Sequence, residues 1–432
     1  MSTLPLIIIV LVGCFFIGMP IFMSLIISAI VAIVSCGYLP LSIIHNSLFD
    51  GVNIFPLLAI PCFVIAGTLM EYGNITKQII DVVKQVVGRL PGGLGITTIL
   101  ACTFFAAISG SGPGTVAAIG TLMIPSMVRS GYSPSYSAAA ASSGGTIGIL
   151  LPPSNPMIIF AILANVSVTA MFTAGIVPGL IVAMLMATMA MVKAKMEGVQ
   201  VDESLPPFSM KVFLVSLYKG APALATPLLI LGSIYSGMAT PVEASVVAIV
   251  WALFVGIVIN KALTFDHIKK SLLEGAMLCG TVLLIVGAST LFGKILTYEQ
   301  APLKLANLVL GVSKNPQIVL IMIVGILYFL GMFMETLSTM IILAPVLLPM
   351  IRNLGIDPIH FGVVMVITNE VAMLTPPLGV NLFVSSRIAN LSVEKISVAV
   401  LPYLAVLTAA ILLIVYCPFL STWLPALIGA GM

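Results

Sequence analysis

Apolar stretches long enough to cross a lipid bilayer recur along almost the whole chain. In the first half they cover about 4–17, 20–36, 54–72, 135–165 and 169–192, and in the second half about 222–237, 240–259, 276–296, 359–388 and 397–425. A helix of about 20 predominantly apolar residues spans the hydrocarbon core of a membrane. The pattern therefore predicts a protein built of membrane-spanning helices.

Two further apolar stretches are each interrupted near the middle by polar residues. The stretch at 95–128 is interrupted by Ser109–Thr115, and the stretch at 317–350 by Glu335–Thr339. Each half of such a stretch is too short to cross a bilayer as a helix. We therefore predict two re-entrant hairpins, each made of two short helices joined by a polar tip.

The few charged segments have different characters. Residues 73–90 and 264–274 place charged side chains among apolar ones at helical spacing, which predicts helices lying along the membrane surface. Residues 193–219 hold lysines, acidic residues and a proline pair, and we expect them to contain the linker between two halves.

Composition supports the membrane assignment. Of the 432 residues, 60% are hydrophobic and 7% are charged, whereas a soluble domain has about 25% charged residues. A net charge of +3 spread along the chain makes no basic face, so nucleic-acid binding is excluded as a main role. The six cysteines lie in apolar runs without CxxC spacing and are expected to be buried apolar residues.

The positions of helix-breaking residues repeat after 224 residues. Thr115 corresponds to Thr339, and Gly131 corresponds to Gly355. Five prolines of the first half match prolines of the second: Pro125, Pro134, Pro152, Pro153 and Pro178 match Pro349, Pro358, Pro376, Pro377 and Pro402. Because proline breaks or kinks helices, the two halves share a pattern of broken helices. We predict a first repeat at 1–200, a cytoplasmic linker at 201–220 and a second repeat at 221–432.

Charge predicts the orientation of the repeats. Five crossings per half is an odd number, so the second half is expected to be inverted. With both termini outside, 13 of the 17 lysines and arginines fall on the cytoplasmic side, and only Lys294, Lys304, Lys314 and Arg352 fall on the outer side. We therefore predict an all-α polytopic membrane protein with two inverted-topology repeats, broken helices and two re-entrant hairpins, a pattern typical of secondary transporters.

The interruptions expose backbone groups inside the membrane, where unsatisfied N–H and C=O groups are costly. A helix that starts at a tip directs N–H groups inward and favours a carboxylate. We predict substrate-binding residues at the tips and at the breaks of two other helices: Ser109, Ser111, Gly112, Thr115, Pro153, Asn155, Thr336, Ser338 and Pro377.

Hydroxyl, amide and carbonyl oxygens in the same segments suit a small hard cation. We predict sodium sites formed by Ser111, Gly145, Thr146, Thr339, Glu335, Asn369 and Thr375. Glu370 is a further candidate for a cation site or for gating, because a charge within the membrane is expensive unless it has a function or a partner. The alternative for both glutamates is a protonated or paired structural carboxylate.

Three motifs resemble those of a known family. Gly110–Gly120, Gly144–Pro156 and Thr375–Asn381 are similar to the large membrane subunit of tripartite ATP-independent periplasmic (TRAP) transporters. The resemblance implies a sodium-driven importer of organic anions in the inner membrane of a prokaryote. It also implies two partners, a small four-helix membrane subunit and a periplasmic substrate-binding protein.

The same resemblance implies an elevator mechanism. The hairpins and broken helices would move as one body against a scaffold made of the first two helices of each half and of arm helices around 37–53 and 261–275. Substrates in the family include C4-dicarboxylates, sialic acid and other sugar acids, and the motifs do not choose among them.

Two other functions are weighed against transport. An intramembrane enzyme would need a nucleophile and a base at one depth, but His45, His267 and His360 are scattered and no HExxH or GxSxG motif occurs, so an enzyme is not expected. A passive membrane channel is the remaining alternative, and it would conduct without a binding protein or an ion gradient.

Overall fold

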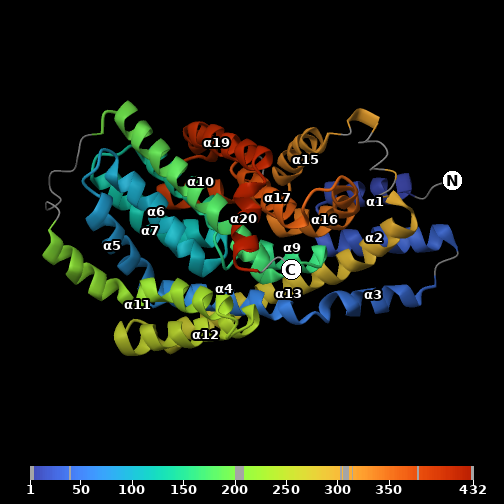
Figure 1. The fold of residues 1–432 in the computed structure, drawn as a ribbon, viewed down its shortest axis with the longest axis horizontal. Helices are drawn as coiled ribbons and strands as arrows, with labels where there is room; N and C mark the ends of the chain where they lie inside the picture. The colour runs from blue at the N-terminus through green and yellow to red at the C-terminus, as the bar shows by residue number, and fades with distance from the viewer. Residues whose placement is uncertain are drawn as a thin grey trace.

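The computed structural model describes residues 4–37, 40–199, 209–301, 304, 311–313, 315–376 and 379–429, and these residues form helices without any strand (Figure 1). The helices of the first half are α1 (Leu4–Phe16), α2 (Ile21–Cys36), α3 (Ser42–Val52), the 3-10 turn η1 (Phe55–Leu58), α4 (Ala59–Tyr72), α5 (Ile75–Val87), α6 (Gly93–Ser109), α7 (Gly112–Arg129), α8 (Pro134–Ile147), α9 (Asn155–Ala164) and α10 (Val168–Met196). Those of the second half are α11 (Met210–Tyr235), α12 (Pro241–Phe254), the π-helical turn η2 (Val255–Ile259), α13 (Phe265–Tyr298), α15 (Pro316–Gly331), α16 (Thr336–Asn353), α17 (Pro358–Ala372), α18 (Val380–Ala389), α19 (Val393–Tyr416) and α20 (Phe419–Leu427).

Within the described residues, seven helical segments are long and apolar enough to cross a membrane. They are Phe55–Tyr72, Val168–Met196, Met210–Tyr235, Pro241–Ile259, Phe265–Tyr298, Thr336–Asn353 and Val393–Tyr416. Other apolar helices, α6 and α9 among them, are shorter, as expected for helices that end inside the membrane. The prediction of an all-α polytopic membrane protein is confirmed.

Helix boundaries recur after the 224-residue shift. The second arm of the first hairpin, α7, and that of the second hairpin, α16, begin and end 224 residues apart. Both helices are followed by a glycine with positive φ, 88° at Gly131 and 70° at Gly355. Asn165 and Asn390, which follow the broken helices, both have a φ of 52°. The same local breaks therefore occur in both halves, while the inverted orientation of the halves stays a prediction.

Two elements differ from the sequence prediction. The prediction of a separate surface helix at 264–274 was wrong, because α13 runs without interruption from Phe265 to Tyr298. The first half is broken near Pro56, but the corresponding part of α13 contains no proline and nothing stops the helix. In addition, α11 begins at Met210, so residues 210–220, which were predicted to belong to the linker, are helical. The charges of Lys211 and Lys219 had made this segment resemble a linker.

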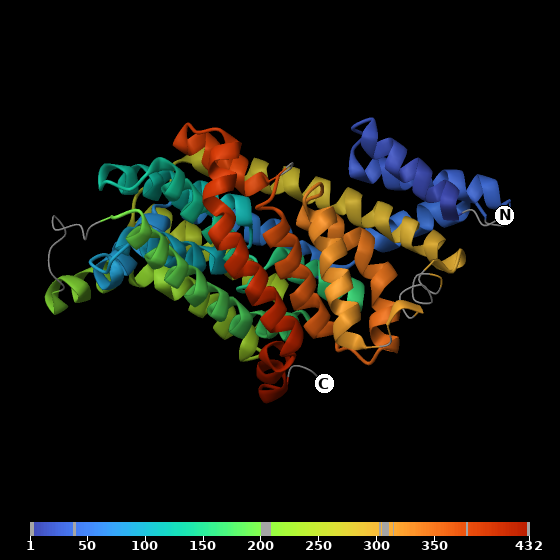
Figure 2. The same cartoon turned by 90° about the horizontal axis from the view of Figure 1, so that it is seen from above.

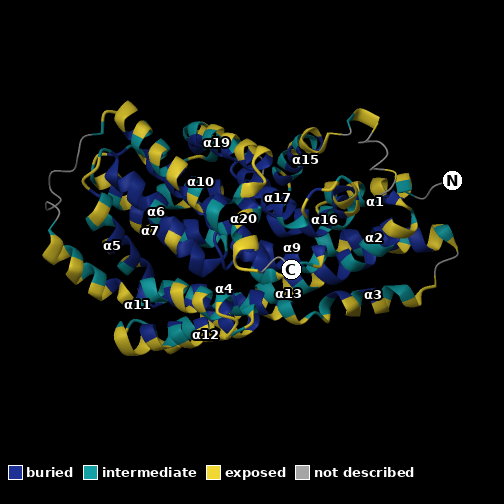
Figure 3. Ribbon diagram, in the orientation of Figure 1, coloured by how far each residue is buried: buried dark blue, intermediate teal, exposed yellow. Residues whose placement is uncertain are grey.

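The broken helices of each half pack against the hairpin of the other half. Helix α18 contacts α7 and α8, and α9 contacts α16. The helices α6, α9 and α17 are mostly buried, whereas α3, α11 and α12 are widely exposed (Figure 3). The packing of broken helices on the opposite hairpins brings both tips and both breaks into one buried region.

The first two helices belong to a different cluster. Residues of α1 and α2, such as Ile7 and Leu25, pack on Leu291 and Phe292 of α13 and form a core separate from the main one. Seen from above, α1 and α2 lie at one end of the molecule, away from α17 and α19 (Figure 2). The structure thus has a central hairpin region and a distinct helical layer at this end.

Tyr136→Phe is expected to destabilise the central region. The Tyr136 hydroxyl is buried and donates a 2.7 Å hydrogen bond to the carbonyl of Ala190 in α10. Losing this bond removes a buried hydrogen bond between α8 and α10, at a cost of about 0.5–1.5 kcal/mol. The thermal unfolding midpoint of the purified chain in detergent should fall, whereas Tyr416→Phe, at an exposed position, should leave it unchanged. Equal midpoints for the two variants would contradict this role.

Candidate functional site

The tip of the first hairpin is a two-residue break between α6 and α7. Gly110 adopts a φ of 60°, a conformation that disfavours side chains, and ends α6. Ser111 is the N-cap residue of α7, and its hydroxyl accepts a hydrogen bond from the N–H of Gly114 at 3.4 Å. The hydroxyl of Thr115 then donates to the carbonyl of Ser111 at 2.8 Å. The N-terminus of α7 is thus fixed at the tip by its own side chains.

The tip of the second hairpin repeats this arrangement with different chemistry. Glu335 precedes α16, and the Thr339 hydroxyl donates to its carbonyl at 3.1 Å. This matches the bond from Thr115 to Ser111 across the 224-residue shift. The Thr336 hydroxyl donates a 2.6 Å hydrogen bond to Oε1 of Glu370 in α17. The second tip is therefore tied to the broken helix beside it.

The two breaks hold buried polar atoms without hydrogen-bond partners in the described structure. Between α8 and α9 they include Oδ1 of Asn155, and around the break between α17 and α18 they include both amide atoms of Asn369 and of Asn381, as well as Oε2 of Glu370. Ser143, Ser338 and Thr375 each contribute an unpaired hydroxyl. Buried polar groups are normally satisfied, so this concentration points to a polar ligand at the breaks.

A cavity of about 70 Å³ lies where the tips and breaks meet. Both tips line it, through Gly110–Pro113 and Glu335–Leu337, and so do Asn155 and Glu370 from the broken helices. The space suits an ion with a few waters. It is much smaller than the roughly 300–1,000 Å³ of pockets for drug-sized ligands.

Glycines let the groups around Glu370 approach closely. A Cβ built on Gly112 would lie 2.9 Å from Oε2 of Glu370, 3.4 Å from the carbonyl oxygen of Gly145 and 3.5 Å from Nδ2 of Asn381. A Cβ on Gly145 would lie 2.9 Å from the carbonyl oxygen of Gly112. A carboxylate, an amide and two carbonyls therefore surround a small space that any larger side chain would fill.

Sequence reasoning did not identify one part of this region. Ser142 of α8 and Ser385 of α18 are buried, with their hydroxyl oxygens 2.6 Å apart, and the Ser142 hydroxyl also lies 3.4 Å from the carbonyl of Asn381. These residues link the two halves beside the glycine cluster. Asn381 could have been recognised as a candidate site residue, because an amide at the start of an apolar helix is unusual. Its contact with Ser142 of the other half could not be predicted from the sequence.

The structure brings together some of the predicted site residues. Ser111, Gly112, Asn155, Glu335 and Thr336 line the small cavity. Gly145 lies beside Gly112, and Asn369 and Thr375 flank the second break with unpaired polar atoms.

Other predicted residues lie outside the cavity lining. Ser109, Thr115, Pro153 and Ser338 are buried close to the tips or breaks, and the Thr146 hydroxyl donates to the carbonyl of Ser143 at 2.7 Å. Thr339 lines a different, mostly apolar cavity of about 700 Å³ between α1, α2 and the second hairpin. Pro377 lies outside the described residues.

Comparison with known proteins gives one family. Residues 8–420 match the family described as tripartite ATP-independent periplasmic transporter, DctM component. The chain is 37% identical to the C4-dicarboxylate TRAP transporter large permease protein DctM of Pseudomonas aeruginosa, covering 88% of this chain and 89% of the relative. It is 35% identical to the sialic acid TRAP transporter large permease protein SiaM of Vibrio cholerae, covering 97% and 98%.

Two further similarities differ in what they cover. The chain is 37% identical to the isethionate TRAP transporter permease protein DctMQ of Oleidesulfovibrio alaskensis over 93% of its own length, but it spans only 63% of that relative. Among solved structures, the YdaH transporter of Alcanivorax borkumensis matches with a TM-score of 0.65 and 15% identity, over 90% of this chain and 89% of that chain. The latter similarity concerns the fold alone.

Proposed function

Because the chain belongs to the DctM component family of TRAP transporters, which are transporter permeases and not enzymes, we propose that it is the large subunit of a sodium-coupled importer of an organic anion. The relatives' names include C4-dicarboxylate, sialic acid and isethionate. These compounds share an anionic carboxylate or sulfonate. We propose such an anion as the substrate of this chain.

The unpaired polar atoms around Glu370 support sodium coupling. A buried carboxylate with a free oxygen is costly unless a cation or a donor satisfies it. Glu370 Oε2 and the carbonyl of Gly145 offer hard oxygen ligands around the space next to Gly112, and the Asn381 side-chain amide, also without a partner in the described structure, lies beside them. We propose that a sodium ion binds there and that its charge helps to hold the anion nearby.

The two tips supply a complementary environment for the anion. Helix dipoles are positive at the first turns of α7 and α16, and the Glu335 side chain does not cap the start of α16. Both ends line the same cavity, together with the amide of Asn155. The volume of about 70 Å³ is too small for a sugar acid, so substrate entry requires at least one tip to move.

Packing supports an elevator-type movement. The hairpins and broken helices contact one another across the two halves, whereas α1 and α2 belong to a separate core cluster with α13. We propose that the hairpin region moves as a unit past a scaffold that includes α1 and α2. An apolar cavity between these helices and the second hairpin would ease such sliding.

The family assignment also suggests the partners. We propose that a small membrane subunit and a periplasmic binding protein complete the transporter in a bacterial inner membrane, with both termini of this chain in the periplasm. The chain itself is a multi-pass membrane protein.

Uptake of a radiolabelled organic acid into proteoliposomes tests the proposal. Vesicles containing both membrane subunits, with the binding protein outside, should accumulate substrate only under an inward sodium gradient. Potassium in place of sodium serves as the control. Accumulation that is unaffected by removing the sodium gradient would contradict the coupling, and current in planar bilayers without the binding protein would favour the passive channel.

A further inference from the structure

A second, larger cavity lies far from the hairpin tips, between α5, α11 and the end of η2. It is an open groove of about 1340 Å³. Figure 1 places α5 and α11 near the end of the molecule opposite α1 and α2. None of the residues that line this groove also lines the small cavity between the tips.

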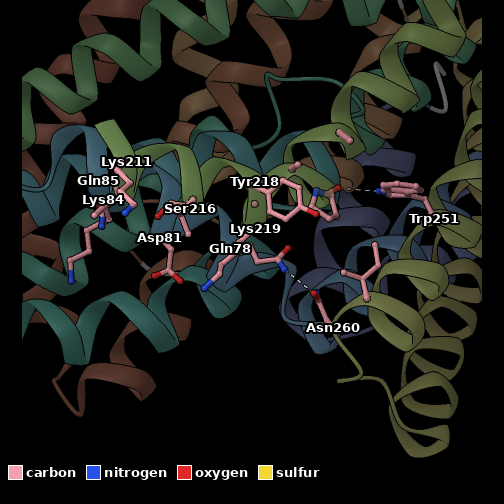
Figure 4. A pocket seen from close by; sticks show the side chains of 17 residues that line it. Gln78, Asp81, Lys84, Gln85, Lys211, Ser216, Tyr218, Lys219, Trp251 and Asn260 are labelled. Atoms are coloured by element: carbon pink, nitrogen blue, oxygen red, sulfur yellow. Dashed lines mark hydrogen bonds between the residues drawn. The ribbon is translucent and has the colours of Figure 1, made fainter. Parts of the chain in front are cut away.

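One part of the groove is basic. Lys84 of α5 and Lys211 and Lys219 of α11 line it, together with the carboxylate of Asp81 (Figure 4). Among the residues that the structure describes, no carboxylate lies within 4.0 Å of these three ammonium groups. With three lysines and one carboxylate in its lining, the groove has a net positive charge that would attract an anion.

The other part is apolar and held rigidly. Val212, Val215 and Ala225 of α11 line it beside the Trp251 ring. Trp251 is fixed by hydrogen bonds of 3.1 Å from its Nε1 to the Pro222 carbonyl and to the Thr226 hydroxyl. This wall is suited to an apolar chain and not to a soluble ion.

The floor between the two parts is polar. Gln78 donates to Oδ1 of Asn260 at 2.8 Å, and Asn260 donates to the carbonyl of Gly73 at 2.7 Å, which joins α5 to the end of η2. Oε1 of Gln78 is buried without a partner in the described structure. It can accept a hydrogen bond from a hydroxyl or amine of a ligand lying across the floor.

We propose that this groove binds an anionic phospholipid, with its phosphate among Lys84, Lys211 and Lys219 and an acyl chain along Val215 and Trp251. An amphipathic helix such as α5 lies at the level of the headgroups, where lysines attract anionic lipids and tryptophan is favoured. A bound lipid would join α5 to α11, and so tie the surface helix to the helix that begins the second half.

Native mass spectrometry of the purified full-length chain tests the proposal. In detergent with equal amounts of phosphatidylglycerol and phosphatidylcholine, we expect the wild type to retain phosphatidylglycerol preferentially. The triple variant Lys84→Gln/Lys211→Gln/Lys219→Gln should lose this retention by about fivefold or more. The matched control Lys269→Gln/Lys270→Gln/Lys395→Gln removes three exposed lysines elsewhere and should keep it.

A second variant separates the lipid from a soluble phosphate. Val215→Trp fills the apolar part of the groove but keeps the lysines, and should also release phosphatidylglycerol; an unchanged unfolding midpoint shows that the variant is folded. Equal losses in both triple variants, or displacement of the lipid by glycerol 3-phosphate at matched concentration, would overturn the proposal. So would a triple variant that keeps the lipid but no longer co-purifies with the small membrane subunit.

Discussion

Glu370→Gln is expected to abolish the sodium dependence of uptake and to lower sodium-driven uptake by about a hundredfold. The substitution keeps the volume of the side chain and an oxygen that can accept the bond from Thr336, but it removes the charge. Losing one member of a buried charge interaction costs about 3 kcal/mol, and about 1.4 kcal/mol corresponds to a tenfold change in affinity. The loss should therefore come from sodium binding and not from misfolding.

The measurement is initial uptake into proteoliposomes as a function of sodium concentration. Glu394→Gln, an exposed position at the start of α19, provides the matched control and should behave like the wild type. A Glu370→Gln variant that retains the wild-type sodium dependence would show that this carboxylate is structural.

Gly112→Ala is expected to raise the sodium concentration needed for half-maximal uptake by about tenfold or more. The added methyl group would stand 2.9 Å from Oε2 of Glu370 and 3.4 Å from the Gly145 carbonyl, closer than a carbon atom tolerates at the first of these. It would occupy the space that we assign to the ion and displace its ligands. A shift of about 1.4 kcal/mol in binding gives this tenfold change.

Gly325→Ala is the control for this substitution. Gly325 lies within α15, and a Cβ built there meets no atom within 4 Å. Its variant should show the wild-type sodium dependence, with equal or slightly higher stability because alanine favours helix. If the two alanine variants behave alike, the space beside Gly112 does not bind the ion.

The sequence predicted the tips because the physical signal there is local. Gly110 and Ser111 in the first hairpin and Glu335 in the second interrupt apolar stretches, and the helices end at these positions. The repeat was visible for the same reason, since the prolines and glycines that break helices recur at a fixed spacing. Local chemistry therefore fixed where helices stop.

The sequence could not predict which helices of the two halves pack against each other. Ser142 and Ser385 are 243 residues apart, and their contact depends on α18 of one half packing on α8 of the other. The continuity of α13 was missed because charged residues at its start suggested a separate surface helix, whereas the absence of proline determined the outcome. Thr339 is predicted at an ion site by its position at a tip, and its place in the lining of the apolar cavity beside α1 and α2 was not predictable from the sequence.

A cryo-electron microscopy map of the transporter in sodium and saturating substrate tests the central claim most directly. The claim is that the tips and breaks of both halves form one site for a sodium ion and an organic anion. We predict density for a cation among Glu370, Asn381 and the carbonyl of Gly145, and the acidic group of the substrate between Gly110–Pro113 and Glu335–Leu337. Substrate density elsewhere, with neither tip in contact, would contradict the account.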